Sequence, residues 1–140
     1  MPWFADLSPY SYWDLSDPHN RREEPRPDLP VRNVGWLDAD HPFPVGDVEE
    51  DLVAALTRLA VARVHQTRGY HLRELCLRDL GDDRLEAVRL GLVARGSAEF
   101  RVLGTQVGYA LPELAVHYLA VHSYQPPAEV RAAALAVTHP

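Results

Sequence analysis

The sequence contains no lysine, and all 14 of its basic residues are arginines. A chain without lysine has no side-chain amine for a Schiff base and no lysine for a phosphate-binding P-loop. It also has a single cysteine, Cys76, so an intramolecular disulfide is impossible. These absences exclude two catalytic mechanisms and a fold stapled by disulfides.

Long apolar runs are missing as well. No segment approaches the roughly 20 apolar residues that span a bilayer. No segment has the charged, apolar and small-residue layout of a signal peptide either. We therefore expect a cytoplasmic protein without a membrane partner.

Acidic residues outnumber basic ones by 20 to 14, which gives a formal net charge of −6. A negative surface repels phosphate backbones, and the arginines are spread along the chain instead of forming a cluster. Nucleic acid is therefore not an expected partner. The length of 140 residues suits one domain, so a single domain over 1–140 is predicted.

The first third of the chain has its own composition. Residues 1–46 hold eight of the 12 prolines and seven of the 12 aromatic residues. Proline interrupts helices and sheets, whereas disordered tails are poor in aromatics. We therefore predict an ordered, mostly extended arm over 1–46 that lays its aromatics on a core built by 47–140. The polar, proline-broken run at 17–27 is predicted to be an exposed loop.

A helix is predicted over 47–65. Asp47 and Glu50 match a capping-box pattern directly after Gly46. Leucines then recur at spacings of four and three residues, which places them on one helix face: Leu52, Leu56 and Leu59.

Strands are predicted where apolar and polar residues alternate, at 87–92, 97–102 and 107–109, with a bulged strand at 70–78. Short glycine-containing turns at 95–96 and 104–105 would connect them. The result is an antiparallel meander of three or four strands.

Two helices are predicted to close the chain. Pro112 opens the first, which ends near Tyr124 and buries Leu114, Tyr118 and Val121. The second follows Pro126–Pro127, with its buried face formed by Val130, Ala133, Ala134 and Val137. A helix, a meander and then two helices make an α+β fold.

Several motifs resemble those of a family of uncharacterised bacterial proteins, a domain of unknown function. They are Phe4–Tyr10, Asn33–Asp38, His41–Pro44, Gln66–His71, Gly96–Val102, and His117–Tyr118 with His122–Pro127. The resemblance covers nearly the whole chain and implies no assigned activity. In some members it implies a short His/Cys cluster after the position of His71, of which only Cys76 stands here.

Zinc is the metal that the histidines and the cysteine would suit, because it binds imidazole nitrogen and thiolate sulfur. The candidate set is His71 and Cys76, joined by His41, His65, His117 and His122 if the fold brings them close. His71 with Cys76, and His117 with His122, fit the usual ligand spacings only loosely. Five residues turn an α-helix by about 500°, which would leave His117 and His122 roughly 140° apart. We therefore expect no cofactor, and keep zinc as the alternative.

Acid–base chemistry would depend on Glu99, the carboxylate between Ala98 and Phe100, and on His117 and His122. The simpler prediction for Glu99 is an ion pair across the sheet with Arg89 or Arg101. No G-x-S-x-G nucleophile motif is present. Cys76 lies between Leu75 and Leu77, which suggests a packed thiol.

The arm offers a different kind of site. Tyrosine, tryptophan and arginine are the residues that protein interfaces favour. Arg21, Arg22 and Arg26 lie close to the aromatics of the arm, and the candidates for partner contact are Trp3, Tyr10, Trp13 and Trp36. The alternative is that these aromatics complete the core.

Two functions follow from the sequence. The first is an accessory or protein-binding domain without catalytic activity, of which an immunity-like antidote is one form, since acidic surfaces suit basic partners. The second is a small metal protein or enzyme, built around His71, Cys76, Glu99, His117 and His122. Binding is favoured because every catalytic motif tested is absent, and the oligomeric state stays open.

Overall fold

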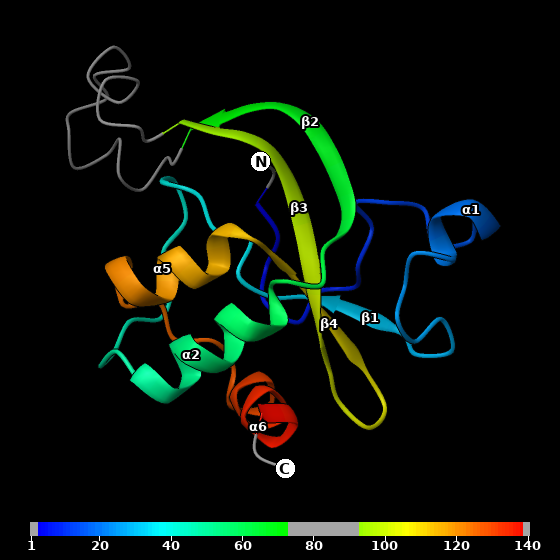
Figure 1. Ribbon diagram of the computed structural model, residues 1–140. Coiled ribbons are helices and arrows are strands. Elements are labelled where there is room, and N and C mark those ends of the chain that lie inside the picture. Colours follow the sequence, from blue (N-terminus) through cyan, green and yellow to red (C-terminus); the bar gives the residue numbers. More distant parts are fainter. Residues whose placement is uncertain (1–2, 73–92, 139–140) are drawn as a thin grey trace.

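The computed structural model describes residues 3–72 and 93–138. Its elements, in chain order, are α1 (Pro18–Arg21), β1 (Val31–Asn33), α2 (Glu50–Leu59), β2 (Val64–Leu72), β3 (Val93–Leu103), β4 (Gly108–Pro112), α5 (Leu114–His122) and α6 (Ala128–Thr138). The fold is α+β, as predicted. Helices α2, α5 and α6 pack together on one side of a four-stranded sheet (Figure 1).

The sheet has the strand order β1-β4-β3-β2. Strands β2, β3 and β4 form the predicted antiparallel meander, whereas β1 pairs with β4 in parallel. Two backbone hydrogen bonds flank this parallel pair: the Gly108 N–H donates to the Pro30 carbonyl at 2.8 Å, and the Val34 N–H donates to the Ala110 carbonyl at 3.0 Å. The arm therefore supplies an edge strand of the sheet, which its proline-rich sequence did not indicate.

The long β3 corrects one predicted turn. Arg95 and Gly96 lie inside this strand, where Arg95 pairs with Tyr70 of β2. Glycine inside a strand often marks a bulge, and the β2–β3 register shifts between Thr67 and Tyr70, the partners of the two residues that flank Gly96. The predicted strand at 87–92, and positions 73–78 of the strand predicted at 70–78, lie outside the described residues.

The turn between β3 and β4 lies where it was predicted. Gly104 follows β3 directly, and its N–H donates to the Val107 carbonyl at 2.9 Å. A side chain at this position would crowd the turn, because a Cβ on Gly104 would lie 3.0 Å from the same carbonyl oxygen.

Helix α2 is shorter than the predicted 47–65. It begins at Glu50 after the N-cap Glu49, whose side chain makes no capping hydrogen bond, so the predicted capping box is wrong. The helix ends at Leu59, and Val64 already pairs with Glu99 in the sheet. Val64, which helical periodicity assigned to the helix, is therefore part of a strand. The predicted buried face is confirmed at Leu52 and Leu56.

The two C-terminal helices also differ in detail from the prediction. Pro112 is the last residue of β4, paired with Glu99, and does not open α5. The buried residues of α5 are Ala115, Tyr118 and Leu119, whereas the predicted Val121 is exposed.

Helix α6 follows the prediction more closely. Val130 and Ala134 are buried as predicted, and Val137 is exposed. No helix in the described part of the chain has the length and apolarity needed to cross a bilayer.

Candidate functional site

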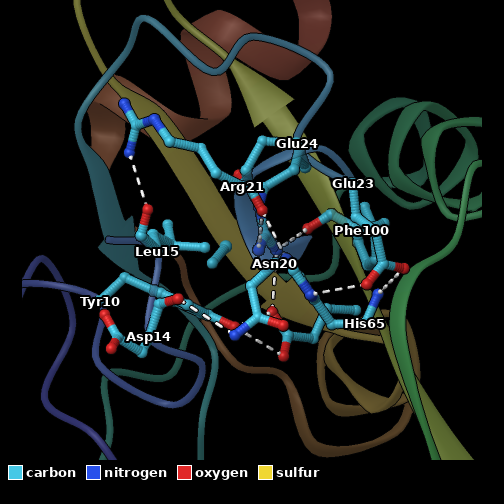
Figure 2. Close-up of polar contacts among 12 residues, drawn as sticks. Tyr10, Asp14, Leu15, Asn20, Arg21, Glu23, Glu24, His65 and Phe100 are labelled. Atoms are coloured by element: carbon cyan, nitrogen blue, oxygen red, sulfur yellow. Dashed lines mark hydrogen bonds and ion pairs between the residues drawn. The ribbon is translucent and has the colours of Figure 1, made fainter. Parts of the chain in front are cut away.

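The central polar feature is a buried cluster around the carboxylate of Glu24. Arg101 donates to it from Nε to Oε1 at 2.9 Å and from Nη2 to Oε2 at 2.8 Å. The Nε2 atom of His65 lies 2.7 Å from Oε2 of the same carboxylate (Figure 2). The Glu24 and Arg101 side chains are 3% and 1% exposed, so this ion pair is removed from water.

A second carboxylate extends the cluster. Arg101 also donates from Nη1 to Oε1 of Glu99 at 3.0 Å, and the Tyr10 hydroxyl lies 2.9 Å from Oε1 and 3.0 Å from Oε2. The Arg101 guanidinium also lies 5.0 Å from the centre of the Tyr10 ring. One arginine therefore joins two buried carboxylates, one from the arm and one from its own strand.

Strand alternation explains why Glu99 and Arg101 share a face of β3. Successive side chains point to opposite faces of a strand, so the neighbouring Phe100 and Val102 enter the hydrophobic core. The other face is covered by the arm, which brings Tyr10 and Glu24. The ion pair predicted for Glu99 forms with Arg101 along one strand and not across two.

His65 is held at the start of β2 in an uncommon backbone conformation, with φ of 50°. Its N–H donates to Oε1 of Glu23 at 3.2 Å, and its Nδ1 atom lies 3.3 Å from Oε2 of Glu23. The Trp13 ring stacks on the imidazole with centroids 5.4 Å apart. His65 is therefore enclosed entirely by residues of the arm and the sheet.

The local electrostatics separate the two carboxylates. Burial by itself would raise the pKa of Glu24, but hydrogen bonds from His65 and Arg101 outweigh it and lower the pKa to about 2. For Glu99 burial prevails and raises the pKa above its ordinary value, despite the opposing effect of Arg101 and Tyr10. Burial, with the adjacent Glu99, also raises the pKa of Tyr10.

Sequence patterns pointed to only part of this cluster. Glu99 was a candidate, but Glu24 lay in the run predicted to be an exposed loop at 17–27, and His65 at the end of a predicted helix. That run contains α1 and the buried Glu24. No local pattern marks Glu24, because its partners are 41 and 77 residues away along the chain.

The predicted metal and histidine candidates lie elsewhere. His71 belongs to β2 and pairs with Ala94, whereas Cys76 lies outside the described residues. His117 and His122 of α5 approach each other edge to face, with ring centroids 5.1 Å apart. The angular separation expected on an ideal helix therefore did not keep these two rings apart. Across residues 3–72 and 93–138, no group of three metal-binding side chains is found.

The four aromatic candidates of the arm lie in three different settings. Trp36 is in the core, where its indole N–H donates to the Ala110 carbonyl at 2.9 Å. Tyr10 and Trp13 cover the buried cluster. Trp3 is 37% exposed and stacks on His41 with ring centroids 3.9 Å apart.

An apolar pocket opens beside the cluster, where the end of α2, the start of β2, the end of β3 and the end of α6 meet. Its volume is about 310 Å³, and its lining residues are Pro25, Arg58, Leu59, Ala62, Arg63, Val64, Arg101, Leu103 and Val137. Two of them connect the pocket to the cluster: Arg101 itself, and Pro25, the neighbour of Glu24. We call it the α2–α6 pocket.

Comparison with known families identifies the chain. The model of the family described as "Domain of unknown function (DUF7919)" matches residues 2–135. The protein belongs to this family. The resemblance to a domain of unknown function is thereby confirmed. No curated protein and no solved structure matches this DUF7919 domain.

In this DUF7919 domain the buried cluster and the α2–α6 pocket suit different tasks. The four carboxylate oxygens of Glu24 and Glu99 all have a hydrogen-bonding partner within the chain. Such a paired network fixes the arm on the sheet. The pocket, in contrast, is open to solvent and can receive a ligand.

Proposed function

We propose that this DUF7919 domain is a non-catalytic protein-binding domain. The observation that carries the proposal is the lining of the α2–α6 pocket. Five lining residues are aliphatic, one is proline and three are arginine. None of these side chains is a nucleophile or a general base at neutral pH, since arginine stays protonated. The pocket has the chemistry of a binding site.

The buried cluster supports the same proposal. An enzyme needs its acid–base residues within hydrogen-bonding reach of a substrate. Glu24, Glu99 and Arg101 are buried and bind one another. Their arrangement supports a structural role, in which these residues hold the arm against the sheet.

The surroundings of the pocket favour a protein over a small molecule. Small-molecule sites enclose most of the ligand surface. Here exposed apolar side chains lie at the lining and next to it in the chain: Val137, a lining residue, is 53% exposed, and Val61, the neighbour of the lining residue Ala62, is 80% exposed. A partner that places a side chain in the pocket would cover these residues too, as interface anchors do.

Site-specific photocrosslinking in the protein's own host cell tests this proposal. A benzophenone amino acid replaces Val61 beside the pocket or, as a matched control, Val45. Both positions are exposed, and Val45 does not line the pocket. We expect one discrete adduct of fixed mass from position 61 and none from position 45.

The specificity of that adduct is checked with a second change. Filling the pocket by Ala62→Trp, at an exposed position of the lining, should abolish the adduct while far-UV circular dichroism stays unchanged. Equal crosslinking from positions 45 and 61, or no adduct from position 61, would contradict a protein-binding function for this surface.

A further inference from the structure

The charged residues that line the α2–α6 pocket have the sign opposite to the net charge of the chain. Arginines provide three of the nine lining residues, and no lining residue is acidic. The chain as a whole has 20 acidic and 14 basic residues. The charged side chains that line the pocket are therefore all basic, although three nearby carboxylates pair with two of them: Glu24 and Glu99 with Arg101, and Glu113 with Arg63.

The three guanidinium groups are not equally available. Arg101 is buried, and its charge is matched by Glu24 and Glu99. Arg101 therefore lines the pocket, but its charge is already neutralised by these two carboxylates. A ligand's negative charge must therefore find its partner at the rim.

Arg58 is the rim arginine best placed for this. It is exposed near the end of α2, and the residues one helical turn earlier, Ala54 and Ala55, carry no carboxylate. Arg63 places its Nε 2.7 Å from Oε1 of Glu113, and its side chain is 58% exposed. Among the described residues no ion pair of Arg58 is found, whereas Arg63 pairs with Glu113.

We infer that the α2–α6 pocket receives an apolar side chain from an acidic segment of the partner protein, whose flanking carboxylates bind Arg58 and Arg63. This inference rests on the proposed function, because it names the partner of the same surface. The walls formed by Leu59, Leu103 and Val137 suit a leucine-sized group. A volume of about 310 Å³ exceeds that of a single side chain, so the pocket has room for an apolar side chain together with the peptide backbone next to it.

The net charge of −6 does not oppose this assignment. At physiological salt, charges more than about 8 Å apart on a surface are largely screened. A carboxylate at hydrogen-bonding distance therefore interacts with the rim arginines and not with the charge of the whole domain. Planar guanidinium groups also bind carboxylates through two parallel hydrogen bonds.

The test titrates blocked pentapeptides into the full chain. Binding is measured from the shifts of backbone amide signals in nuclear magnetic resonance spectra. The probe has one leucine between two pairs of aspartates. One control replaces the leucine by serine, and the other replaces the aspartates by lysines. We expect shifts at Leu59, Ala62 and Val137, and affinity for each control peptide lower by about tenfold or more.

Variants of the rim identify the charges involved. Arg58→Glu should weaken binding of the acidic peptide about fivefold and reverse the preference between the aspartate and lysine peptides. Arg131→Glu is the matched control, because this arginine lies on α6 outside the pocket lining and pairs with Glu49. Unchanged melting temperatures would show that both variants fold.

Other outcomes assign the pocket differently. Tighter binding of the lysine peptide, or of octanoate at the same amides, would overturn the inference in favour of a basic partner or a small amphiphilic anion. A concentration-dependent dimer that protects these amides would assign the pocket to a second copy of the chain. If no peptide binds while the adduct at position 61 persists, the acidic segment is wrong and the proposed function stands. If both are absent, both fail.

Discussion

The Arg101 guanidinium binds the Glu24 carboxylate through two hydrogen bonds, of 2.9 Å from Nε and 2.8 Å from Nη2, between residues 77 positions apart in the chain. This pair joins β3 to the arm in a place that water does not reach. A bidentate pair between arginine and carboxylate is among the stronger polar contacts in proteins. It gives the arm a fixed position on the sheet.

Glu24→Gln should destabilise the fold by about 2–5 kcal/mol, because it leaves a buried arginine without half of its counter-charge. Chemical denaturation monitored by circular dichroism measures the effect. Glu23→Gln is the matched control: its carboxylate also contacts His65 but is 48% exposed, so the expected cost is below about 1 kcal/mol. Similar losses of unfolding free energy for the two variants would show that the buried Glu24–Arg101 pair does not stabilise the arm on the sheet.

The stability of the wild type should fall in acid through Glu24. The pKa of this carboxyl is lowered from 4.5 to about 2 by folding, so its contribution is complete above pH 4.5 and is lost as the pH falls toward 2. The free-energy gap between wild type and Glu24→Gln should therefore close over that window. Denaturation curves at stepped pH provide the measurement.

Glu99 should behave in the opposite way. Folding raises its pKa, so the folded state holds this proton more tightly than the unfolded state does. The stability of the wild type relative to Glu99→Gln should therefore increase as the pH falls through the folded pKa of Glu99. The measurement is the unfolding free energy of the wild type, Glu24→Gln and Glu99→Gln at stepped pH. The same pH dependence for Glu24→Gln and Glu99→Gln would contradict the opposite pKa shifts of the two carboxyls.

Leu56→Ala should cost about 2–5 kcal/mol of unfolding free energy, because the side chain is buried between α2 and the rest of the core. The neighbouring Thr57→Ala is exposed and should change stability by less than about 0.5 kcal/mol. A small melting shift for Leu56→Ala would remove this residue from the core.

Gly35→Ala should destabilise by about 1–3 kcal/mol, since Gly35 has a φ of 77° and an added Cβ would lie 3.0 Å from the Ala115 Cβ. Gly46→Ala is the comparison, because the crowding there comes from the flexible side chain of Gln125. Thermal unfolding of both variants checks the order. Equal stability of the two variants would mean that the left-handed backbone at position 35 adds no cost for alanine.

The sequence by itself determined the class of fold and much of the core. Helical periodicity predicted α2 and its buried residues Leu52 and Leu56, and alternation predicted the strand that holds Phe100 and Val102. These signals are local: side chains three, four or two positions apart share a face through backbone geometry alone.

Only the tertiary structure decided the ends of the elements and the polar cluster. Val64 leaves the predicted helix because its backbone pairs with Glu99 of β3, and the N–H of the next residue, His65, donates to Glu23. The arm became an edge strand for the same reason, through pairing with the distant β4. Glu24 looked like a solvated loop residue, since a carboxylate is stable in the interior only with partners that distant segments supply. Folding of the chain places Arg101 and His65 next to Glu24, and no residue spacing in the sequence predicts these long-range contacts.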